Sequence, residues 1–84
     1  MRAEILVATE LLAAHRRTLV GLSTEANGLI LLIRSMLFPY EEDVTALRID
    51  ETASSAQRLS EIVHAMKTLK GKITELEIDL GCET

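Results

Sequence analysis

Apolar residues recur at alternating steps of three and four through the first half of the chain. The series starts at Ile5 and continues to Met36, and a helix with 3.6 residues per turn brings all of its members onto one side. Such a seven-residue repeat is typical of a helix that packs lengthwise against other helices. We therefore predict a first helix over about residues 2–37. Asn27-Gly28 lies inside it without a change of phase, so we expect one helix that a kink could bend at this point.

The pattern stops at Pro39, which disfavours helical backbone at Phe38, and a short acidic turn over 38–44 follows. A second apolar series predicts another helix over about 45–70, which Asp43 or Thr45 could cap. Gly71 is a weak point, because KITELEIDL after it also alternates between apolar and polar residues. We leave residues 71–84 open between helical and extended structure.

Two long helices with one short connection predict an all-α fold, an antiparallel helical hairpin. Apolar residues make up 48% of the 84-residue chain, and the helix is apolar nearly all round at Ile30, Leu31, Leu32 and Leu37. That segment should be buried from more than one side, and pairing two hairpins into a homodimeric four-helix bundle would achieve this. The residues predicted to line the contact, which we term the seam, are Leu12, His15, Leu19, Leu22, Ala26, Leu29, Ile33, Leu59, Ile62, Met66 and Leu69.

Charge and composition argue against several classes of function. The net charge of −4 provides no basic surface for nucleic acid, and the longest mainly apolar run, 26–33, is too short to span a membrane. Cys82 is the single cysteine, so no internal disulfide or multi-cysteine metal site can form, which favours a reducing, cytoplasmic location. We expect no cofactor, no metal and no enzymatic activity, because neither His15 nor His64 has a convergent set of ligands or catalytic partners.

The segment ETASSAQRLSEIVHAMKTLKGKI, residues 51–73, resembles the second helix of the dimerisation and histidine-phosphotransfer domain (DHp, or HisKA-like) of sensor histidine kinases. The resemblance covers about residues 8–73 and implies a hairpin that dimerises into a four-helix bundle. It also implies a response regulator or a histidine kinase as partner. In that family the first helix carries an H-box, in which a phosphoaccepting histidine at the bundle surface is followed by an acid.

The apolar phase decides which residue takes the phosphoacceptor's place. With His15 there, Arg17 and Thr24 would turn inward, whereas with Arg17 there Leu19, Ala26 and Ile33 turn inward. The second alignment makes the better core. Under it, the resemblance assigns Arg17 to the phosphoacceptor's place, Thr18 to the acid's and Leu22 to a proline's, a degenerate H-box.

Three hypotheses follow. The chain is a non-enzymatic homodimer that resembles a DHp domain and binds or regulates a signalling protein, or it is a phosphotransfer protein that uses His15 with Arg16 and Arg17 beside the phosphoryl group. The third is a small four-helix adaptor without signalling ancestry. In the first and third, His15 is a polar seam residue that fixes the alignment of the helices. His64 and the lysines at 67, 70 and 72 are expected on a solvent-exposed face.

Overall fold

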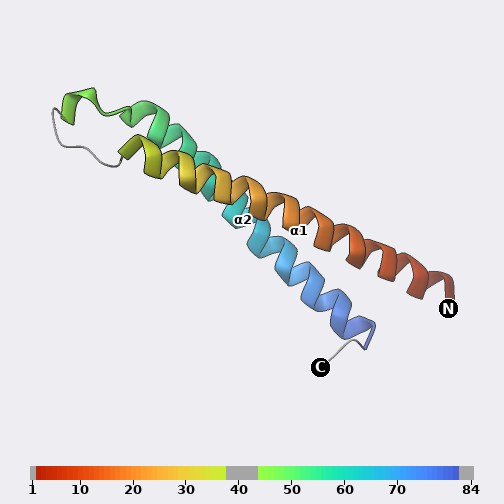
Figure 1. Cartoon of the computed structure of the whole chain (residues 1–84). Coiled ribbons are helices and arrows are strands. Elements are labelled where there is room, and N and C mark those ends of the chain that lie inside the picture. Colours follow the sequence, from red (N-terminus) through yellow and green to blue (C-terminus); the bar gives the residue numbers. More distant parts are fainter. Residues whose placement is uncertain (1, 38–43, 82–84) are drawn as a thin grey trace.

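The computed structural model describes residues 2–37 and 44–81. They form helix α1 (Arg2–Leu37), a short 3-10 helix η1 (Val44–Ala46) and helix α2 (Ile49–Asp79). The two long helices lie against each other in opposite directions (Figure 1), and the described residues contain no strand. The predicted all-α helical hairpin is confirmed. The six residues 38–43, and with them the candidate cap Asp43, lie outside the described part.

Helix α1 runs without interruption through Asn27 and Gly28. Its threonines do not disturb it, because their hydroxyl groups donate hydrogen bonds to backbone carbonyls one turn earlier. Thr9 Oγ1 donates to the Ile5 carbonyl at 2.8 Å, and Thr18 Oγ1 donates to the Ala14 carbonyl at 3.0 Å. A hydroxyl bonded in this way is compatible with a helix interior.

Helix α2 begins later than the sequence pattern indicates, at Ile49 and not near residue 45. Residues 44–46 form a separate 3-10 turn, closed by a 3.2 Å hydrogen bond from the Leu47 N–H to the Val44 carbonyl. Arg48 then occupies the N-cap position without a capping side chain. Thr45 therefore does not cap α2, because it lies within the preceding turn.

Helix α2 continues past Gly71 and ends at Asp79, so of the two alternatives for the tail the helical one holds for residues 71–79. Beyond Gly71, Ile73 is 8% exposed and Leu76 packs against the core, whereas Ile78 is 57% exposed. The apolar residues after Gly71 therefore follow a helical spacing, and the extended alternative does not describe residues 71–79. Gly81 stops the chain's helical path with a φ of 70°, a conformation that glycine adopts at low cost.

The core lies between α1 and α2, and a cluster of buried residues packed on one another lies in the half of the hairpin nearest the chain ends. There Leu12, Leu69 and Ile73 form a buried cluster, against which four half-buried leucines pack. Ile62, only 1% exposed, lies near the middle of α2, and Met36 is buried close to the connection. The whole hairpin measures 65 × 22 × 15 Å, so it is a thin rod.

Candidate functional site

The seam residues lie between α1 and α2, on the less exposed side of each helix. Four of the eleven are buried and the other seven are half-buried. The buried ones are Leu12, Ala26, Ile62 and Leu69, and the half-buried ones are His15, Leu19, Leu22, Leu29, Ile33, Leu59 and Met66. Within one chain, these residues therefore serve the contact between its own two helices.

His15 and its neighbours do not assemble into a reactive group. His15 is half-buried on the seam, and Arg17 is exposed. Arg16 is held elsewhere, because its guanidinium donates a 2.8 Å hydrogen bond to Glu77 Oε2 on α2. The Thr18 hydroxyl is bonded to its own helix. A phosphoryl group on His15 would therefore have to draw Arg16 away from an existing ion pair.

Two ion pairs between the helices show which sides of α1 and α2 adjoin. Arg16 pairs with Glu77, and Arg58 Nε donates to Glu25 Oε2 at 2.9 Å. Residues seven apart lie on nearly the same side of a helix that packs lengthwise. The first pair thus joins the row 9, 16, 23, 30, 37 of α1 to the row 49, 56, 63, 70, 77 of α2. The second pair joins the row 4, 11, 18, 25, 32 to the row 51, 58, 65, 72, 79.

The first of these two sides is apolar near the connection and polar near the chain ends. Its connection half consists of Ile30, Leu37, Ile49, Ala56 and Val63, which we term the apolar flank. All five are exposed, the four larger ones by 39–53%. The chain-end half of the same side carries Thr9, Arg16, Ser23, Lys70 and Glu77.

The second side is mixed near the connection. Its residues there are Glu25, Leu32, Glu51, Arg58 and Ala65, which we term the opposite flank. Leu32 is 45% exposed, much like Ile30, but it lies on the side of the Glu25–Arg58 ion pair. The apolar flank is thus a property of one side of the hairpin and not of the whole connection half.

The sequence predicts that the segment around Ile30 to Leu37 is buried from more than one side, and in the single chain α2 covers it from one side only. Within the single chain, Leu31 is 64% exposed and Leu32 is 45% exposed, because one neighbouring helix covers only the side of Ile33 and Met36. Ile5, the first residue of the apolar series, is 57% exposed, because the two helices diverge toward the chain ends (Figure 1). In the described part of the chain, thirteen large apolar residues are exposed.

A shallow groove of about 390 Å³ on α2 includes two residues of the apolar flank, Ala56 and Val63. It is lined by Ala56, Leu59, Ser60, Val63, His64 and Lys67. His64 and the lysines at 67, 70 and 72 are all exposed, as predicted. The groove is open and its lining is mainly small or apolar, so it offers His64 no convergent partner for chemistry.

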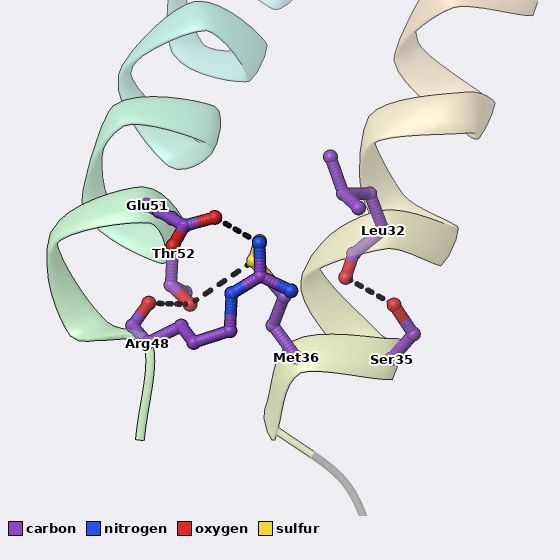
Figure 2. Close-up of polar contacts among 6 residues, drawn as sticks. All are labelled: Leu32, Ser35, Met36, Arg48, Glu51 and Thr52. Atoms are coloured by element: carbon purple, nitrogen blue, oxygen red, sulfur yellow. Dashed lines mark hydrogen bonds and ion pairs between the residues drawn. The ribbon is translucent and has the colours of Figure 1, made fainter. Parts of the chain in front are cut away.

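Polar contacts near the start of α2 fasten it to its own backbone and to α1 (Figure 2). The Thr52 hydroxyl donates a 2.7 Å hydrogen bond to the Arg48 carbonyl and lies 3.8 Å from Met36 Sδ. Arg48 also forms an ion pair with Glu51, and its hydrogen bond lowers the pKa of that carboxyl below the usual 4.5. Farther along α2, the hydrogen bond of Arg58 to Glu25 of α1 raises the pKa of Arg58.

The described residues provide no cluster of three or more His, Cys, Asp or Glu side chains that could hold a metal ion. Neither helix in this part of the chain has the length and apolarity needed to cross a membrane.

The sequence pattern did not reveal the apolar flank as one surface. Its members are visible in the sequence as apolar residues at seven-residue spacing, 30 and 37 in one helix and 49, 56 and 63 in the other. What sequence could not supply is the pairing of these two rows, which rests on Arg16 and Glu77, 61 positions apart.

Comparison of the chain with known proteins identified no similar one. No protein-family model matches the chain, and neither a curated protein nor a solved structure is significantly similar to it.

Proposed function

We propose that this protein is a non-enzymatic interaction module that works as a homodimer, with two hairpins packed into a four-helix bundle. The observation that carries the proposal is the surface area of the single chain. A compact protein of 9.3 kDa is expected to expose about 5000 Å², whereas this hairpin exposes 6553 Å². The hairpin thus exposes roughly 1500 Å² more than a compact chain of its mass, and thirteen large apolar residues of its described part are among the exposed ones.

An excess of this size matches what a stable dimer removes from water. Two chains that each buried it would form an interface of about 3000 Å², within the range of obligate homodimers. Exposed apolar patches of more than a few hundred Å² are uncommon on monomeric proteins and mark interaction sites. A second hairpin is the partner that supplies an equally long apolar surface.

The partner of the dimer is proposed from the DHp-like pattern of residues 51–73, and it is a response regulator or a histidine kinase. Arg17, which takes the phosphoacceptor's place in that comparison, is exposed. An arginine there could contact an acidic surface but could not accept a phosphoryl group in the way a histidine does. The module would therefore bind or regulate a signalling protein without phosphotransfer.

Sedimentation equilibrium from 0.1 to 100 μM, combined with circular dichroism, tests the dimer. We expect a mass of two chains through most of this range, with helix content that falls together with the dimer on dilution. Fully helical single chains at every concentration would overturn the proposal.

Incubation with histidine kinases and radiolabelled ATP tests the absence of phosphotransfer. We expect no label on this chain. Acid-labile label that disappears in a His15→Gln variant would favour the phosphotransfer hypothesis instead. A dimer that is unlabelled and binds no response regulator or kinase would favour the plain four-helix adaptor.

A further inference from the structure

We infer that the apolar flank, Ile30, Leu37, Ile49, Ala56 and Val63, is the face on which a second copy of this chain packs, with the two connections at the same end of the bundle. This inference rests on the proposed homodimer and specifies its interface and orientation. Neither follows from dimerisation alone, because a hairpin has two flanks and two hairpins can align in either direction.

The choice of flank follows from what each side would lose on contact with another protein. The apolar flank carries no charge over five positions that are all exposed. The opposite flank would bring the carboxylates Glu25 and Glu51 and the guanidinium Arg58 into an interface, where they would lose their hydration. Removing charged groups from water is unfavourable unless each gains a partner, whereas apolar groups gain by leaving water.

The position of the apolar flank beside the seam supports the same choice. In a four-helix bundle each helix contacts two neighbours, so its buried stripe is wider than in a two-helix hairpin. Ile30 and Leu37 border the seam residue Ile33 on one side, and Val63 borders Ile62. Adding the apolar flank to the seam would therefore make one continuous core in the connection half.

The orientation follows from the change along this side from apolar to polar. With both connections at the same end, the apolar half of one chain meets the apolar half of the other over the full overlap. If the chains ran in opposite directions with full overlap, the apolar flank would face Arg16, Lys70 and Glu77 of the second chain. A shifted opposite arrangement could match the two apolar halves, but it would leave the other halves without contact. Only the first arrangement buries the apolar flank of both chains while their polar halves face each other, so Arg16, Lys70 and Glu77 lie away from the apolar flank of the second chain.

Matched substitutions on α1 test the choice of flank. Ile30 and Leu32 are 41% and 45% exposed and lie two positions apart on opposite flanks. We expect Ile30→Glu to weaken dimerisation at least 100-fold, and Leu32→Glu to change it by less than about threefold. Val63→Glu and Ala65→Glu provide the same comparison on α2. The measurement is the dimer dissociation constant from sedimentation equilibrium, with helix content followed by circular dichroism.

A distance measurement tests the orientation and does not depend on the stability of the glutamate variants. In a Cys82→Ser chain, a spin label attached to Ala3→Cys marks the chain-end half of α1. At about 10 Å per helix diameter, connections at the same end place the two labels within ~30 Å of each other, whereas at 1.5 Å per residue opposite orientations place them ~50 Å apart or farther. Pulsed electron paramagnetic resonance on the dimer separates these values.

The outcomes distinguish this inference from the proposal on which it rests. A wild-type chain that stays monomeric and folded overturns both. A dimer that Ile30→Glu and Leu32→Glu weaken equally leaves the dimer standing and overturns this interface. If Ile30→Glu fails to fold, the label distance decides, because a separation of 50 Å or more excludes the arrangement inferred here.

Discussion

The most direct test of the packing between α1 and α2 is the replacement of Ile62 by alanine. Ile62 is the most deeply buried large side chain in the described part of the protein, at 1% exposure. The change removes three carbon atoms, worth about 0.8 kcal/mol each on transfer from water. The better helix propensity of alanine returns about 0.4 kcal/mol, and the cavity left behind adds to the loss. We expect the free energy of unfolding to fall by about 3 kcal/mol, within the range of 2–5 kcal/mol seen for such changes.

That loss is large for a chain of this length, whose total stability is expected to be about 4–13 kcal/mol. Urea denaturation followed by circular dichroism measures it, at one fixed protein concentration because association shifts the apparent stability. Ile78→Ala is the matched control, since the same atoms are removed from a side chain that is 57% exposed. Its loss should stay below about 1 kcal/mol. Equal losses at the two positions would refute the packing described here and would mean that α2 is rotated relative to α1.

Three further predictions concern glycines and charges. Gly71→Ala should stabilise the hairpin by about 0.5–1 kcal/mol, because the added methyl group would meet no atom within 4 Å apart from its chain neighbours and the backbone of its own helix. Gly81→Ala should destabilise the hairpin by about 1 kcal/mol, since φ is 70° there. Thermal unfolding of the two variants compares them. Glu51 should titrate below pH 4.5 in a carboxyl-carbon NMR experiment. Because its pKa is lower in the folded than in the unfolded protein, its contribution to stability is present above pH 4.5 and is lost as the pH falls through the folded pKa. A midpoint at or above pH 4.5 would contradict its ion pair with Arg48. Reversing Glu25 and Arg58 together should restore stability lost by either reversal alone, with a coupling below about 1 kcal/mol because both side chains are exposed, and a double-mutant cycle without coupling would refute the pairing.

The extent of α1 could be predicted from sequence, because its apolar repeat is long and regular enough to outweigh Asn27-Gly28. The bounds of α2 could not, for two local reasons. Good capping residues near 43–45 suggested an early start, but residues 44–46 form a 3-10 turn and α2 begins at Ile49 without a side-chain cap. Gly71 suggested an early end, but its cost of about 1 kcal/mol is smaller than the gain from burying Ile73 and Leu76 beyond it.

The candidate surface was less predictable than the fold. Periodicity places a residue on one side of its own helix, but it does not determine which side of α1 adjoins which side of α2. That relation depends on how far each helix is rotated about its axis, and in this hairpin it is visible in the contacts of Arg16 with Glu77 and of Glu25 with Arg58. His15 illustrates the same limit, because its place on the seam was predictable whereas the engagement of Arg16 with α2 was not.

The uneven distribution of the core along the hairpin affects how the protein should open. The leucine-rich cluster around Leu12 and Ile73 secures the half nearest the chain ends, whereas the connection half has Thr52 and Ser55 at positions that face α1. Amide hydrogens in the two halves should therefore exchange with solvent through different events. Dilution of the dimer would accelerate exchange in the connection half first, and the chain-end half would lose its protection as the helix content falls.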